Sequence, residues 1–158
     1  IRTPERAQAL VALGASGVIL ASSLFKGGAV DLEFARRVSE AVTLDRFIAA
    51  VDSRSGHVVV DGWRTLLDLT PTEAVRALEP YAGEFLYTHV DREGLMQGTD
   101  MAAIQAVRNA TTRRLTAAGG ITTLEEVAFL DSINVDAVVG MAIYTGRMSL
   151  PAGPGKPR

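Results

Sequence analysis

Segments with helical spacing of apolar residues alternate along this chain with short, continuous apolar runs. The helical segments cover residues 3–13, 31–42, 71–81, 99–109 and 122–133. The apolar runs cover residues 17–20, 46–51, 84–88, 114–118 and 136–140. Thr3-Pro4 and Thr70-Pro71 place an N-cap residue before a proline at the first helical position. This alternation predicts an α/β fold in which helices cover the faces of a parallel sheet.

An internal repeat favours a barrel over an open sheet. An ungapped alignment that places Ile1 on Ile121 also places Thr3 on Thr123, helix on helix and strand on strand. A duplicated half-barrel would have this register. A closed (β/α)8 barrel has eight strands and about 250 residues. We therefore expect residues 1–150 to form a partial barrel of five parallel strands, from the helix before strand four to strand eight. Residues 151–158 are predicted to be a disordered tail.

Composition excludes several classes of protein. The 158 residues are 47% apolar and 22% charged, as in a globular protein. A net charge of −2 gives no electrostatic reason to bind nucleic acid. The absence of cysteine excludes disulfides and thiolate sites. No apolar stretch approaches the ~20 residues of a membrane helix, so a cytoplasmic protein is expected.

Two glycine positions at neighbouring strand ends indicate an anion site. Gly119-Gly120 follow the run 114–118 and precede a helix, and Gly140 ends the next run. Glycines allow a phosphate to approach the backbone, and free N–H groups at a helix N-terminus point at the anion. The alternative is that Gly119-Gly120 only turn the chain.

Polar residues at other strand ends are candidates for proton transfer. Asp52 follows the run 46–51, Thr88 ends the run 84–88, and Glu93 lies in the charged loop 89–98. Carboxylates in such places can be tuned for acid–base catalysis. Asp52 and Thr88 could instead satisfy loop backbone groups. His57 and His89 have no evident metal-ligand partner, and an exposed or packing role is expected for both.

Four motifs together resemble one known family. They are the segment 49–56 with Asp52 followed by Gly62-Trp63, the segment 86–94, Ala118-Gly119-Gly120-Ile121, and the segment 139–147. Over residues 1–150 the chain is similar to the phosphoribosylformimino-aminoimidazole carboxamide ribotide isomerases (ProFAR isomerases) of histidine biosynthesis. The related imidazole glycerol phosphate synthase cyclase ranks second, because its last strand and the segment after its strand five differ from this chain.

The resemblance implies an Amadori rearrangement, in which an aminoaldose becomes an aminoketose without metal or cofactor. Asp52 matches the family's proton donor on strand five, and Thr88 matches a threonine that assists it. Glu93 stands where the family has aspartate, and is a rival for the acid. The family's base lies on strand one, which this sequence does not contain. We therefore expect the isolated chain to be inactive.

The implied substrate carries a phosphate at each end. One phosphate site would use Gly119, Gly120, Gly140 and Met141, and the other would use Arg2, Ser22 and Ser23. Trp63 is either a hydrophobic plug or a stacking platform for the substrate's heterocycle. No nucleic acid or membrane partner is expected. The full-length protein is expected to be monomeric, whereas this chain could self-associate through open sheet edges as a non-catalytic binding or assembly module. An open α/β phosphate-binding domain is a further alternative.

Overall fold

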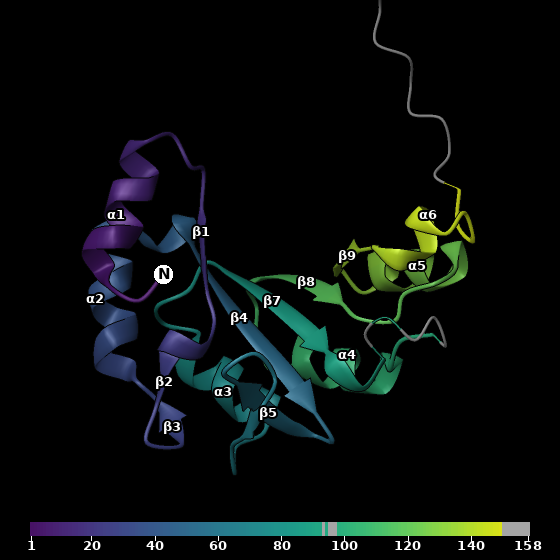
Figure 1. Ribbon diagram of the computed structural model, residues 1–158, viewed down its shortest axis with the longest axis horizontal. Coiled ribbons are helices and arrows are strands. Elements are labelled where there is room, and N and C mark those ends of the chain that lie inside the picture. The colour runs from purple at the N-terminus through teal and green to yellow at the C-terminus, as the bar shows by residue number, and fades with distance from the viewer. Residues whose placement is uncertain (93, 95–97, 150–158) are drawn as a thin grey trace, which may run out of the picture.

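Strands and helices alternate along the chain in the computed structural model, which describes residues 1–92, 94 and 98–149 (Figure 1). The predicted tail 151–158 and the candidate acid Glu93 lie outside the described residues. The helices are α1 (Pro4–Ala12), α2 (Leu32–Val42), α3 (Pro71–Leu78), α4 (Met101–Arg108), α5 (Leu124–Ser132) and α6 (Met141–Tyr144). The strands are β1 (Val18–Leu20), β2 (Phe25–Lys26), β3 (Ala29–Val30), β4 (Phe47–Arg54), β5 (His57–Val60), β6 (Thr65–Leu66), β7 (Glu84–His89), β8 (Arg114–Ala118) and β9 (Asp136–Val138). Within the described part of the chain, no helix is long and apolar enough to cross a membrane.

The main sheet has seven strands, and the order of its five parallel strands follows the chain. β1 pairs with β4, β4 with β7, β7 with β8 and β8 with β9, and every one of these pairs is parallel. The predicted α/β fold with adjacent parallel strands is therefore confirmed. Among the described residues the sheet does not close, since β1 and β9 each have one neighbour in it.

The carboxyl end of β4 departs from the prediction. The strand continues to Arg54 instead of ending at residue 51, and it pairs there with antiparallel β5, which in turn pairs with β6. β1 reaches only Leu20, opposite Ala49, so its early end leaves this edge of β4 free for β5. The last strand ends at Val138, two residues earlier than predicted, because Gly140 becomes the N-cap of α6.

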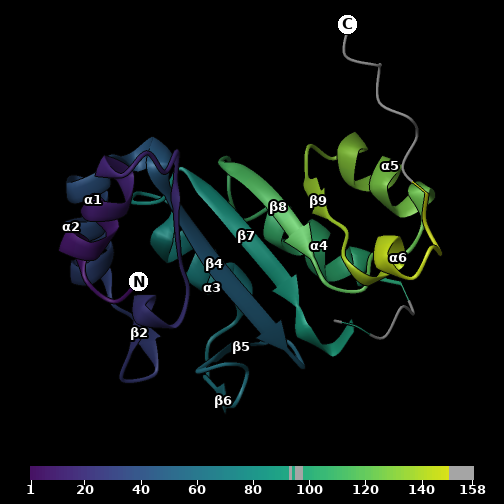
Figure 2. The same ribbon diagram turned by 45° about the horizontal axis from the view of Figure 1, so that its top comes forward.

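The two faces of the sheet differ in burial. One face is fully buried and includes Phe47, Val51, Phe85, Tyr87 and Leu115. The alternate residues on the other face are less covered, and they include Ile48, Leu86, Thr116 and Ala118. α3 and α4 lie behind the sheet in both views (Figures 1 and 2). The continuous apolar runs predicted helices on the faces of the sheet. In the described residues α3 and α4 lie against the fully buried face, and the other face stays partly open.

The predicted caps begin the helices. The Thr3 hydroxyl accepts a hydrogen bond from the backbone N–H of Arg6, and Thr70 forms a reciprocal capping box with Glu73 at the start of α3. Such caps satisfy N–H groups that a helix leaves without a partner. These caps therefore stabilise the N-terminal ends of α1 and α3.

Candidate active site

One row of register partners crosses the sheet at the carboxyl ends of its strands. Asp52 on β4 pairs with Thr88 on β7, Thr88 with Ala118 on β8, and Ala118 with Val138 on β9. Register partners on parallel strands point to the same face. The row lies on the more open face, because Ser53 on the alternate face is buried. The structure thus places Asp52 and Thr88 at the end of the sheet where Gly119 begins.

The Asp52 carboxylate is held by the only tryptophan of the chain. The indole Nε1–H of Trp63 donates a hydrogen bond to Asp52 Oδ2 at 2.8 Å. Trp63 sits in a turn whose three consecutive residues, Asp61, Gly62 and Trp63, have φ of 56°, 66° and 66°. Left-handed backbone is costly for residues other than glycine. The structure therefore maintains a strained turn that brings the indole to the carboxylate.

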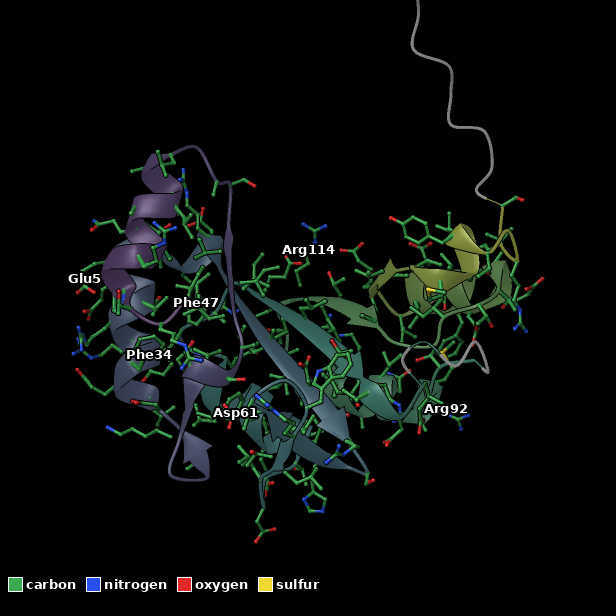
Figure 3. All side chains as sticks on the ribbon, viewed as in Figure 1. Glu5, Phe34, Phe47, Asp61, Arg92 and Arg114 are labelled. Carbon is green, nitrogen blue, oxygen red and sulfur yellow. The ribbon has the colours of Figure 1, made fainter. Side chains whose placement is uncertain are left out.

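Two further hydrogen bonds fix this turn. The backbone N–H of Asp61 donates to the Ser22 hydroxyl at 2.9 Å, and Arg54 Nη1 donates to the Trp63 carbonyl at 2.8 Å. Figure 3 shows Asp61 and Arg92 toward the carboxyl ends of the strands, with Arg114 at the opposite end. The loops after β1 and β5 therefore meet the end of β4 at one end of the sheet.

A pocket opens beside this row where β8 and β9 end. Its empty space is about 450 Å³, partly open to solvent, and its lining includes Gly119, Gly120, Gly140 and Met141. A methyl group at Gly140 would meet no atom within 4 Å, so this glycine faces open space. The pocket brings together the four residues that the sequence predicted for one phosphate.

The helix termini at this pocket differ from the prediction. Sequence reasoning expected free N–H groups where α5 begins. Instead, the backbone N–H groups of Thr122 and Thr123 donate to the Glu126 carboxylate at 2.7 and 3.1 Å. The N-cap of α6, Gly140, has no side-chain cap. The start of α6, which has no side-chain cap, is a further source of backbone donors at this pocket.

The family model described as "Histidine biosynthesis protein" matches residues 1–149. The chain belongs to this family. Similar relatives are found in Methanocaldococcus jannaschii (32% identity over 151 residues), Caldicellulosiruptor bescii (33% over 152) and Thermus thermophilus (36% over 152). Each is named as a 1-(5-phosphoribosyl)-5-(5-phosphoribosylamino)methylideneamino imidazole-4-carboxamide isomerase.

These alignments cover 95% of this chain and 62 to 63% of the relatives. The chain therefore spans a little less than two thirds of the length of the curated relatives it matches. The resemblance to the ProFAR isomerases, predicted from the four motifs, is confirmed.

The two glycines of this histidine biosynthesis family member also have a packing role. Gly119 and Gly120 have φ of 99° and 75°. A methyl group at Gly119 would lie 2.5 Å from the carbonyl oxygen of His89, and one at Gly120 would lie 2.6 Å from Cβ of Arg92. The loop after β7 thus lies directly on the glycine turn. The turning role and the phosphate role are compatible, because the glycines contact the loop and also line the pocket.

The residues predicted for the second phosphate are less closely grouped. Arg2 is exposed, and within the described residues no hydrogen bond joins it to Ser22 or Ser23. Ser22 accepts the hydrogen bond from Asp61, whereas the Ser23 hydroxyl is buried, and no partner for it is found in the described part of the chain. Of these three residues, Ser22 and Ser23 directly follow the end of β1, whereas Arg2 precedes α1.

The histidines lie away from the Asp52 row. His57 is exposed on β5. His89 is buried on the alternate face of β7, where its register partner is Ser53. Its Nε2 lies 3.7 Å from Asp100 Oδ2. The packing role predicted for His89 agrees with this position.

Sequence reasoning missed two polar features beside the site. The Ser53 hydroxyl and the Tyr87 hydroxyl share a buried hydrogen bond of 2.7 Å between β4 and β7. Burial raises the pKa of Tyr87, and the charges of Asp100 and Asp91 add to this, whereas the Ser53 hydrogen bond opposes it. The available signal was that successive side chains of a strand point to opposite faces, which places Ser53 on the face opposite to Asp52.

Glu126 is the other missed residue. Burial alone would raise its pKa, but hydrogen bonds from Thr122, Thr99 and Thr123 together lower the pKa of this carboxyl below its ordinary value. The Thr123-x-x-Glu126 capping pattern was visible in the sequence. Its contact with Thr99 was not, since that residue lies in another loop.

Proposed function

We propose that the protein acts in the ProFAR isomerase reaction, the Amadori rearrangement of the aminoaldose ProFAR to the aminoketose PRFAR. The arrangement that carries the proposal is a carboxylate, Asp52, in register with the Thr88 hydroxyl and at the same sheet end as a glycine-lined pocket. The isomerase names of the three relatives support this reaction over the cyclase alternative.

Proton transfer divides between two groups in this proposal. Asp52 donates a proton to the ribose ring oxygen, which opens the ring, and Thr88 on the next strand assists by hydrogen bonding. As the ring opens, the C1′–O4′ bond breaks and the nitrogen lone pair forms a C1′=N bond. A base then removes the C2′ proton to give an enaminol, and loss of the C2′ hydroxyl proton with addition of a proton at C1′ gives the aminoketose. This base is assigned to the part of the relatives' length that the chain does not span. Glu93, outside the described residues, remains the rival acid.

The fold proposed for the whole protein is the family's (β/α)8 barrel. β1, β4, β7, β8 and β9 would be its strands four to eight. Their parallel order, their buried helix-side face and their more open second face support this assignment. In a barrel that second face becomes the packed interior.

The two substrate phosphates would bind at opposite sides of the row. Gly119, Gly120, Gly140 and Met141 bind one through backbone N–H groups, and the uncapped start of α6 supports this assignment. Arg2, Ser22 and Ser23 contribute to the other. Trp63 then lies between the two phosphate sites and stacks on the heterocycle when its indole leaves Asp52.

Trp63 provides a direct test of binding. As the only tryptophan, it reports ligand at Asp52 through its emission. Titration of the 158-residue chain with PRFAR should change that emission, and Gly140→Ala should weaken the effect. Unchanged emission, together with no heat of binding, would contradict the proposal.

Turnover is tested in a chimera. These 158 residues replace the segment that they match in the Thermus thermophilus relative, which then supplies the rest of a barrel. The chimera should convert ProFAR to PRFAR. A folded chimera that instead forms imidazole glycerol phosphate with ammonia would favour the cyclase.

An assembly module is the second candidate. Ile19 on β1 and Val138 on β9 are each 50% exposed on the outer strands of the sheet. Exposed apolar edge strands promote pairing between chains. Sedimentation of the 158-residue chain would show a dimer that Ile19→Lys dissociates. A monomer at all concentrations would eliminate this candidate.

A further inference from the structure

The carboxylate of Glu126 joins two loops at the glycine pocket. Its Oε2 accepts hydrogen bonds from the backbone N–H of Thr122 at 2.7 Å and of Thr123 at 3.1 Å, and from the Thr122 hydroxyl at 3.1 Å. Its Oε1 accepts from the backbone N–H of Thr99 at 2.9 Å, although Thr99 is 27 residues away in the sequence. One oxygen therefore holds the start of α5, and the other holds the segment that leads into α4.

The backbone around this carboxylate leaves no space for other side chains. A methyl group at Gly98 would lie 3.0 Å from Glu126 Oε1. A methyl group at Gly120 would lie 2.8 Å from the Gly98 carbonyl oxygen. A side chain at position 120 would therefore displace the Gly98 backbone, which directly precedes Thr99. The contact is an integral part of the packing between the two loops.

Both loops contribute to the pocket that we assign to a phosphate. Gly94 lines it from the loop after β7, and Gly119, Gly120 and Thr122 line it from the turn after β8. Glu126 occupies the Thr122 and Thr123 donors, which removes them from anion binding. The glycine turn and the start of α6 line the pocket without such a contact to Glu126.

We propose that Glu126 is a positioning residue that locks Gly98 and Thr99, which lead into α4, to the glycine turn after β8 and so fixes the shape of the phosphate pocket. This inference rests on the proposed function of that pocket. Glu126 acts through Thr99 and Thr122 and does not touch the substrate itself.

Glu126→Gln separates this role from simple helix capping. Glutamine at the third helical position still completes a capping box, so a helix cap alone survives the change. The amide has one acceptor oxygen, and its NH₂ group cannot accept from an N–H. It can therefore serve Thr122 and Thr123 or Thr99, but not both sides.

The experiment measures amide hydrogen exchange in the 158-residue chain, with Glu126→Gln, Glu126→Ala and the exposed neighbour Glu125→Gln as the matched control. In Glu126→Gln, exchange at Thr99 should accelerate on the order of tenfold while Thr123 stays protected, since a charge-assisted hydrogen bond is lost. Glu126→Ala should accelerate exchange at both, and Glu125→Gln at neither. If Thr99 in Glu126→Gln exchanged at the wild-type rate, the proposal would be overturned, and Glu126 would act only as a helix cap.

Titration with inorganic phosphate gives the second readout. The dissociation constant should rise on the order of tenfold in Glu126→Gln and stay unchanged in Glu125→Gln. Unchanged phosphate affinity in Glu126→Gln also overturns the positioning role. If the wild-type chain binds no phosphate, the assigned pocket is wrong, and the exchange at Thr99 alone decides whether Glu126 locks the loops.

Discussion

Trp63 Nε1 lies 2.8 Å from Asp52 Oδ2, so the indole occupies one oxygen of the candidate acid. Trp63 is the last of three consecutive residues with left-handed backbone, which begin at Asp61. Asp52 itself is the register partner of Thr88. A proton transfer from the occupied oxygen requires the indole to leave first.

Asp52→Asn should separate chemistry from binding. Asparagine keeps the shape and can accept from Trp63, but it has no acidic proton. In the chimera we expect turnover to fall ~10²–10⁴-fold, the usual effect of losing one acid–base group, with substrate binding retained. Glu93→Gln should reduce turnover less. Steady-state kinetics and Trp63 emission measure the two effects, and the opposite ranking would make Glu93 the acid.

Gly120→Ala and Gly140→Ala form a matched pair at the pocket. The first places a methyl group 2.6 Å from Arg92 Cβ at φ 75°, so unfolding free energy should fall by more than about 2 kcal/mol. The second meets no atom within 4 Å and should change stability little. It should nevertheless weaken phosphate binding, because the methyl group enters the pocket. Urea unfolding and phosphate titration of both variants check this contrast.

Glu79 should make stability pH-dependent. Burial alone would raise its pKa, but hydrogen bonds from Thr111 and Thr112 and the charge of Arg113 lower the pKa below the ordinary 4.5. A lowered folded-state pKa gives stability that is present above the ordinary value and is lost as the pH falls through the folded value. At pH 7, Glu79→Gln should cost about 1 kcal/mol, discounted for partial exposure.

Urea unfolding at several pH values measures this dependence. The difference between wild type and Glu79→Gln should shrink as the pH drops below 4.5. Glu125→Gln, on an exposed helix face, serves as the control and should show no such convergence. If the difference in unfolding free energy stayed constant down to pH 3, the charge of Glu79 would contribute nothing to stability.

Ser53 and Tyr87 should be energetically coupled. Each hydroxyl satisfies the other in a buried position. Ser53→Ala and Tyr87→Phe should each cost about 1–2 kcal/mol, since each leaves a buried hydroxyl unpaired. The double variant should cost less than the sum by at least about 0.5 kcal/mol. Strict additivity in urea unfolding would show that the hydrogen bond contributes nothing to stability.

Local patterns predicted the elements, because their causes are local. Thr70 before Pro71 predicted the start of α3, and the apolar run 84–88 predicted β7, which extends to His89. The extension of β4 to Arg54 was missed because it depends on a hairpin partner, β5, that forms only when β1 stops early. Strand ends were therefore the weakest part of the prediction.

The sequence indicated the candidate site residues, but not the hydrogen bonds that they form. Register alone brings Asp52 and Thr88 together, and both residues stand at the ends of apolar runs that the sequence shows. The Trp63 contact depends on a left-handed turn at Asp61 and Trp63, where neither residue type demands such backbone. The Glu126 contact with Thr99 joins two loops, and nothing local to either segment encodes it.

The order of the main strands has a consequence for synthesis. Each strand of the series β1, β4, β7, β8 and β9 pairs with the one made just before it, with a helix between them. A nascent chain can therefore dock each new strand on an edge that has already left the ribosome. Each pairing closes a loop of only one helix and its connections, which costs less entropy than pairing with a more distant strand and limits the time during which a growing edge stays exposed. Growth of the sheet by one strand and one helix at a time suits a protein built by repetition of that unit.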